Sequence, residues 1–290
     1  KAFFTQAESL EYEEQLDRVR HNVRLQLIDL FSLFYQNDPL LRQTRREVDN
    51  TFDPDHFSLL GNPGNVAHKG DRDAIKAFNA ILKKEFGFSL HNRPSSIPGA
   101  GNGIFVEGSV PPGTVVSIYP GVVYIRDYVQ AGDHEGLFGT DDEGSYTMSR
   151  VDGTIINADC PQIGRRTPLS DGHIINHPSG IPADAHAETG AKLYGTPNVM
   201  VCPFDFPKMN SKESFPTELY QYIPNEFYKP PTVWSSEEAK VAHAQSILLV
   251  TTQEIRDSEL FLDYRYNPKV ALPAWYTPVN VEENRRRWAI

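Results

Sequence analysis

Hydrophobic positions near the start of the chain recur at steps of three and four residues, with charged residues between them. This pattern predicts a helix over residues 10–35, which the run Asn37-Asp38-Pro39 ends. A second amphipathic pattern predicts a helix over residues 71–86, with Gly87 as its C-terminal stop. Plain packing against the rest of the molecule explains both helices, and binding of a partner is the alternative for the first.

After Gly87 the pattern changes to short runs of β-forming residues separated by glycine and proline, which indicates a β-rich domain. Two stretches interrupt it as insertions, residues 126–148 and residues 204–244. The second ends in a short helix that Ser235 and Glu238 would open as a capping box. We therefore expect a helical region over residues 1–87, a β-rich domain over 88–268 and a C-terminal tail over 269–290. The expected strands are residues 103–106, 114–124, 153–157, 174–175, 198–202 and 246–252.

Composition narrows the function classes. Of the 290 residues, 39% are hydrophobic and 23% are charged, as in ordinary globular proteins. The formal net charge of -10 argues against direct binding of nucleic acid, whereas it tolerates a basic peptide as partner. No run approaches the roughly 18 apolar residues that span a bilayer, so we expect no membrane partner. Nothing in the sequence indicates an oligomeric state.

The chain has two cysteines, Cys160 and Cys202. This count excludes a disulfide framework and a four-cysteine zinc site. It also favours a reducing compartment, so we expect an intracellular protein of the nucleus or the cytoplasm.

A glycine cluster, Pro98-Gly99-Ala100-Gly101-Asn102-Gly103, precedes one of the expected strands. Glycines let a backbone approach a ligand and expose its N–H groups. A dinucleotide-binding fold would need a helix after this turn, but a second strand follows instead. A plain β-turn is the alternative.

His173 and His177 are four residues apart, a spacing that suggests a metal at first sight. The further ligands would have to come from Cys160, Cys202, His186 or a carboxylate, and none of these stands at a recognisable spacing. We therefore expect no metal.

Tyr264 and Tyr266 stand two residues apart, so an extended segment would place both rings on one side. Two phenols on one face can line a narrow channel, donate hydrogen bonds and offer their π faces to a cation. Ordinary packing of two tyrosines is the alternative.

The order of these motifs resembles the SET-domain protein lysine methyltransferases over roughly residues 88–276. The motifs are the Gly-x-Gly turn, Tyr119-Pro120-Gly121, Asn176-His177, Pro197-Asn198 and Glu259-Leu-x-x-Asp-Tyr264. The resemblance implies an α+β fold, a β-clip of several small, mostly antiparallel sheets around two ligand sites. The N-terminal helical region would pack against these sheets.

The resemblance also implies S-adenosylmethionine as cofactor. In the family the Gly-x-Gly turn and the Asn-His motif hold it, and a C-terminal aromatic residue often stacks on its adenine. Trp275 is the candidate for that aromatic residue, with packing of the tail as the alternative. The other implied cofactor-binding residues are Ala100, Gly101, Asn102, Gly103, Asn176 and His177.

The catalytic tyrosine of the family corresponds to Tyr264, and Tyr119 and Tyr266 would line the channel for the substrate lysine. Leu262 and Val201 stand at the positions that commonly set the number of methyl groups. Both are aliphatic, so few hydrogen bonds would restrain the amine, and we expect that more than one methyl group is added. The implied partner is a basic, lysine-containing protein or peptide; a histone tail, and with it a role in chromatin, is one example.

The sequence departs from the family pattern after the Asn-His motif, where Pro178-Ser179 replaces the usual Ser-Cys. The cysteine-rich, zinc-binding segment that often follows the domain is missing. These departures and the insertions keep two alternatives open. One is a SET-fold interaction module with little or no turnover, and the other is methyl transfer to an acceptor other than lysine.

Overall fold

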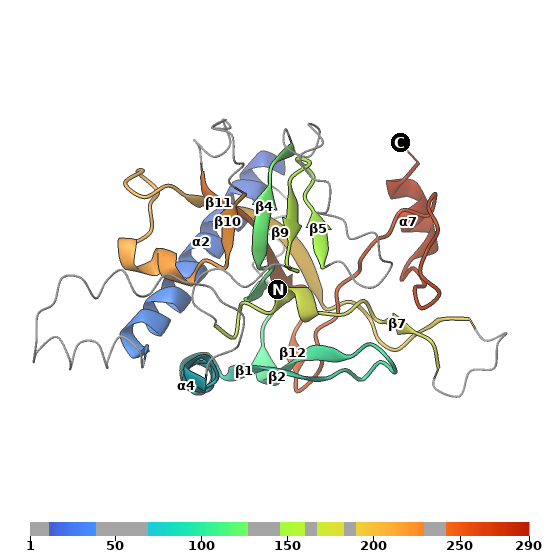
Figure 1. Ribbon diagram of the computed structural model, residues 1–290, viewed down its shortest axis with the longest axis horizontal. Coiled ribbons are helices and arrows are strands. Elements are labelled where there is room, and N and C mark those ends of the chain that lie inside the picture. Colours follow the sequence, from blue (N-terminus) through green and yellow to red (C-terminus); the bar gives the residue numbers. More distant parts are fainter. Residues whose placement is uncertain are drawn as a thin grey trace, which may run out of the picture.

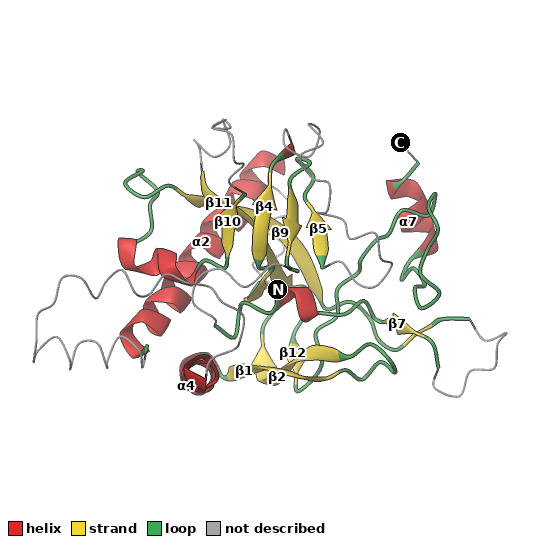
Figure 2. Ribbon diagram, in the orientation of Figure 1, coloured by secondary structure: helices red, strands yellow, loops and turns green. Residues whose placement is uncertain are grey.

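The structure is a computed structural model that describes residues 12–38, 69–126, 146–159, 167–182, 190–228 and 242–289. It combines helices with small, mostly antiparallel sheets, which confirms the α+β expectation (Figure 2). None of the described helices is long and apolar enough to cross a membrane. Several sequence-based expectations lie outside the described residues: most of the 126–148 stretch, the capping box of Ser235 and Glu238, Cys160 and His186.

The α-helices are α2 (Tyr12–Asn37), α4 (Lys69–Phe86) and α7 (Val281–Arg287), and two short 3-10 helices are η2 (Gly172–Ile174) and η3 (Thr217–Tyr222). Helix α7 lies at the right of Figure 1 and α4 at its lower edge, left of centre. The first sheet joins β1 (Phe88–Pro94), β2 (Asn102–Val110) and β12 (Ile255–Arg256). The second has the order β10 (Asn225–Phe227), β4 (Gly121–Tyr124), β6 (Ile155–Asn157) and β5 (Thr147–Ser149).

The third sheet places β11 (Ala242–Thr251) between β3 (Val115–Ile118) and β9 (Val199–Pro207). A small ribbon pairs β7 (Ser179–Gly180) with β8 (Lys192–Leu193). All these pairs are antiparallel except β10 with β4.

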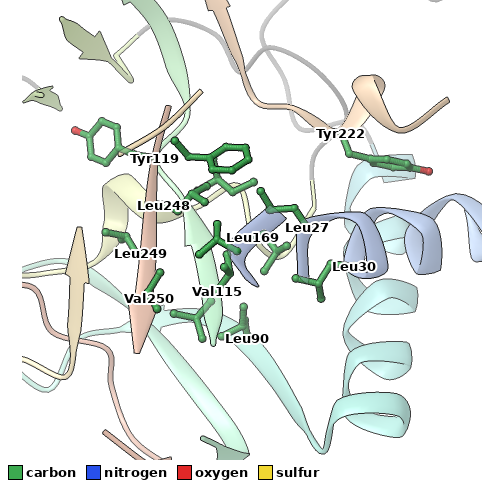
Figure 3. Packing of buried hydrophobic residues seen from close by; sticks show 14 of the residues in the cluster. Leu27, Leu30, Leu90, Val115, Tyr119, Leu169, Tyr222, Leu248, Leu249 and Val250 are labelled. Carbon is green, nitrogen blue, oxygen red and sulfur yellow. The ribbon is translucent and has the colours of Figure 1, made fainter. Parts of the chain in front are cut away.

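Helices and sheets share one hydrophobic core. Leu27 and Leu30 on α2 pack beside Val115 of β3 and Leu248 of β11 (Figure 3). The ring of Phe34 on α2 lies 4.6 Å from that of Phe78 on α4. The helices therefore support the back of the third sheet, whose strand β9 also reaches the cavity described below. The domain boundaries drawn from the sequence stay predictions.

The predicted helices are confirmed, with a shift of two residues or fewer at each described end. Gly87 has a φ of 82° and its N–H donates to the Lys83 carbonyl, as expected of a C-terminal stop. The strand expected over residues 174–175 is wrong. The chain there forms η2 and then runs extended, because the Ile174 and Ile175 N–H groups turn back to Asp171 and Gly172.

Candidate functional site

A partly open cavity of about 1240 Å³ lies between β5, β9, the segment after η2 and the C-terminal tail. It exceeds the roughly 300–1,000 Å³ that is usual for a site holding one small molecule. Gly101, Asn102 and Gly103 do not line it. The predicted site residues that do are Ala100, Tyr119, Asn176, His177, Val201, Leu262, Tyr264, Tyr266 and Trp275.

The segment that leads to Tyr264 is fixed by hydrogen bonds on both sides. The Asn198 side chain donates to the Glu259 carbonyl over 2.8 Å and accepts from the Phe261 N–H over 2.8 Å. The Leu262 N–H donates to the Asn176 carbonyl. Asn198 therefore acts as a structural clamp, a role that its place in the Pro-Asn motif did not reveal.

Tyr264 is held at both ends. Its hydroxyl donates to the Ile175 carbonyl over 3.0 Å, and its backbone N–H donates to Nδ1 of His177 over 3.2 Å. Burial raises the pKa of the Tyr264 phenol well above its ordinary value, and the neighbouring Tyr266 adds to this. The phenol is therefore neutral at physiological pH and can orient an amine but not remove its proton.

The rings of Tyr264 and Tyr266 meet edge to face with centroids 5.7 Å apart. The extended segment expected between them is wrong, because Arg265 has a left-handed φ of 52°. The Arg265 carbonyl accepts a hydrogen bond from Nε1 of Trp288, and its N–H donates to the Asp263 side chain. A kink supported from both sides, rather than the alternation of a strand, brings the two phenols together.

Tyr119 enters the cavity just after β3, and burial raises the pKa of its phenol strongly. Its ring lies 6.5 Å from that of His173, which in turn lies 5.4 Å from Tyr146. Sequence reasoning gave Tyr146 no role, and it considered His173 only as a metal ligand. The His173 ring contacts both Tyr119 and Tyr146, which assigns all three to the same wall of the cavity.

Residues 98–100 of the glycine cluster line the cavity, and residues 101–103 support it from outside. The Asn176 side chain donates to the Asn102 carbonyl over 2.9 Å. A side chain on Gly103 would overlap the Glu259 carboxylate, so a larger residue here would displace Glu259. Gly101, with a φ of 72°, adopts a conformation that favours glycine.

His177 joins three parts of the site. Its Nδ1 accepts from Tyr264, so the neutral ring carries its proton on Nε2, which lies 2.9 Å from the Thr277 carbonyl. Burial lowers the pKa of His177, which favours this neutral form. Its ring packs 4.6 Å from that of Tyr276 in the C-terminal tail.

The C-terminal tail forms one wall of the cavity. The Ser179 hydroxyl donates to the Trp275 carbonyl over 3.0 Å and accepts from the Thr277 N–H over 3.1 Å. The partly exposed Trp275 ring meets those of Tyr264 and Tyr266 edge to face. Trp288, at the end of α7, also lines the cavity, and sequence reasoning missed it.

The described part of the chain contains no group of three or more histidine, cysteine, aspartate or glutamate side chains that could hold a metal ion. Two of the candidate ligands considered from the sequence, Cys160 and His186, lie outside that part.

No family model matches the chain. Among curated proteins it is similar to SET domain-containing protein 9 of Homo sapiens, with 26% identity over 271 aligned positions that cover 87% of this chain and 74% of the relative. The protein of the same name from Pongo abelii is also 26% identical, and the match covers 81% of its length.

Proposed function

Because this chain is related to the SET-domain proteins, we propose that it is an S-adenosylmethionine-dependent protein-lysine N-methyltransferase. The observation that carries the proposal is the position of Tyr264. Its phenol, oriented by Ile175 and His177, shares one cavity with Tyr119 and Tyr266.

The cavity fits a cofactor together with a substrate side chain. Its volume of about 1240 Å³ leaves room for both. The cavity that Asn176 and His177 line is also lined by residues 97–100, Trp275 and Trp288. Backbone polar groups suit the polar parts of S-adenosylmethionine, and aromatic faces suit its adenine and its cation. When bound, this cofactor supplies an electrophilic methyl group on a sulfonium.

The tyrosines prepare the acceptor. A lysine side chain, with an ordinary pKa of about 10.4, is an ammonium at neutral pH and cannot attack. Tyr119 and Tyr264 are buried and neutral, so the channel favours the uncharged amine and its proton leaves to solvent. The Tyr264 hydroxyl donates to the Ile175 carbonyl, and its oxygen still has lone pairs that can accept an amine N–H. Orientation of this kind lowers a barrier by several kcal/mol.

Two measurements test the proposal. Titration calorimetry should detect binding of S-adenosylmethionine to the wild type and a marked loss of affinity in Asn176→Ala. A cell lysate incubated with the protein and methyl-labelled cofactor should yield labelled methyl-lysine on amino-acid analysis. Tyr264→Phe should lower this transfer about 100-fold. Tyr194→Phe, a hydroxyl removed outside the cavity, should not change it.

Each outcome separates the readings. A folded wild type that neither binds the cofactor nor labels any protein contradicts the proposal and favours an interaction module. Label found only on an amino acid other than lysine contradicts the lysine channel and supports the other acceptor class.

A further inference from the structure

The turn between β5 and β6, residues 150–154, is tightly organised. The Arg150 N–H donates to the Thr154 carbonyl over 2.8 Å, and the Gly153 N–H donates back to the Arg150 carbonyl over 3.1 Å. The Thr154 N–H also donates to the Asp152 side chain over 3.0 Å. The turn is therefore held in one conformation.

The Arg150 side chain fastens this turn to the neighbouring sheet. It is only 6% exposed and pairs with Asp152 and Asp205, each over 2.8 Å. It also donates to the carbonyls of Phe204 on β9 and Ser246 on β11. Its contacts with Asp205, Phe204 and Ser246 fasten the turn to β9 and β11.

Val151 stands on this turn with its side chain 95% exposed. Tyr146 is 47% exposed and Val201 is 38% exposed, and both line the same cavity as Val151. A single exposed valine is ordinary, but several apolar side chains around one opening mark a binding surface. We name this surface the apolar rim; it consists of Tyr146, Met148, Val151, Val201 and Pro203.

We propose that the apolar rim binds a hydrophobic side chain adjacent to the target lysine, so that the substrates are lysines flanked by apolar residues. This inference rests on the proposed function. When a lysine enters the channel, its chain neighbours, with Cα atoms about 3.8 Å away, stay at the opening. Val201 belongs both to the predicted channel and to the rim, so the two surfaces are continuous.

Charge near the rim disfavours an acidic neighbour. Asp152 and Asp205 share one arginine, Arg150, so this cluster carries a net charge of about -1. An acidic flanking residue would approach the two carboxylates. An apolar side chain instead removes Val151 from water without disturbing these pairs, and the rigid turn loses little conformational freedom on binding.

The test uses synthetic peptides with one central lysine in an identical Gly-Ser-Arg background. The residues on either side of the lysine are leucine in one peptide and serine in the other. With labelled S-adenosylmethionine, the wild type should show about tenfold higher kcat/KM for the leucine peptide. Val151→Asp should abolish this preference while cofactor affinity stays unchanged. Val270→Asp, the same change at an exposed valine outside the cavity, should keep the preference.

Equal kcat/KM for the two peptides, or an unaltered preference in Val151→Asp, overturns the inference and leaves the proposed function intact. Failure to methylate either peptide also overturns it, because apolar neighbours would then not suffice for recognition. The proposed function itself fails only on the separate measurements of cofactor binding and lysate labelling.

Discussion

Replacing Glu259 by glutamine tests how the edge of the candidate cofactor site is held. The Glu259 carboxylate is only 4% exposed. It accepts hydrogen bonds from the Ser95 hydroxyl over 2.6 Å, the Ser96 N–H over 2.8 Å and the Ser96 hydroxyl over 2.5 Å. Asn176 approaches the same carboxylate at 3.5 Å. One buried side chain thus joins the loop before the glycine turn to the Asn-His motif.

The expected loss of stability follows from these hydrogen bonds. A hydrogen bond to a charged group contributes about 1.5–3 kcal/mol, against about 0.5–1.5 kcal/mol for a neutral one. Glutamine keeps the shape but loses the charge, and its NH2 group cannot accept from the serine donors beside it, so the loss averages roughly 1 kcal/mol for each of the three bonds. We expect Glu259→Gln to lower the free energy of unfolding by about 3 kcal/mol. Affinity for S-adenosylmethionine should fall about tenfold, because residues 97–100 line the cavity.

Urea unfolding followed by tryptophan fluorescence measures the free energy of unfolding, and titration calorimetry measures the affinity for S-adenosylmethionine. Glu107→Gln is the matched control on β2, since the Glu107 side chain is exposed and its ion pair with Lys83 spans 3.5 Å. The control should change stability by less than about 1 kcal/mol. If Glu259→Gln behaves like the control in both measurements, the inference that Glu259 holds the edge of the candidate cofactor site is refuted.

Three further predictions concern the same cavity. Ser179→Ala removes both hydrogen bonds to the tail and should weaken cofactor binding about tenfold in calorimetry. Unchanged affinity would contradict the inference that Ser179 holds the tail at the cofactor site. Burial lowers the pKa of His177 from 6.5, so below about pH 6.5 the unfolded chain binds a proton that the folded chain does not. Stability should therefore fall as the pH drops from 7.5 to 5.5, with a smaller fall in His177→Gln; equal falls in the urea midpoint would exclude this role. With aliphatic Leu262 and Val201 in the channel, mass spectrometry should detect more than one methyl group per lysine, and only monomethyl product at long times would contradict this.

The elements that sequence reasoning predicted well are those with strong local signals. Helix α4 combines apolar periodicity with Gly87, whose positive φ ends it. The expected strand at residues 174–175 failed because two β-branched residues have high strand propensity, while the local N–H groups satisfy themselves in η2. Strand propensity reflects how well a residue packs in a sheet. The backbone N–H groups of these two residues instead form hydrogen bonds within their own turn.

Cavity residues that stand in a sequence motif could be predicted. Cavity residues that only the tertiary structure brings to the site could not. Tyr264, Asn176 and His177 stand in motifs, and the structure gathers them in one cavity. Tyr146 and Trp288 carry no such signal, because their contacts bridge more than twenty residues of chain. The kink at Arg265 was also hidden, since a non-glycine residue in the left-handed region has no sequence signature.

The departure at Pro178-Ser179 has a structural counterpart. Where the family pattern continues with Ser-Cys, the Ser179 hydroxyl donates to the Trp275 carbonyl and accepts from the Thr277 N–H, and Nε2 of His177 contacts the Thr277 carbonyl. The tail is therefore fastened by hydrogen bonds to the segment that also positions Tyr264. Such bonds contribute about 1 kcal/mol each. Cofactor affinity should accordingly respond to changes in Ser179 more strongly than the unfolding of the core does, because α2 and the third sheet take no part in this attachment.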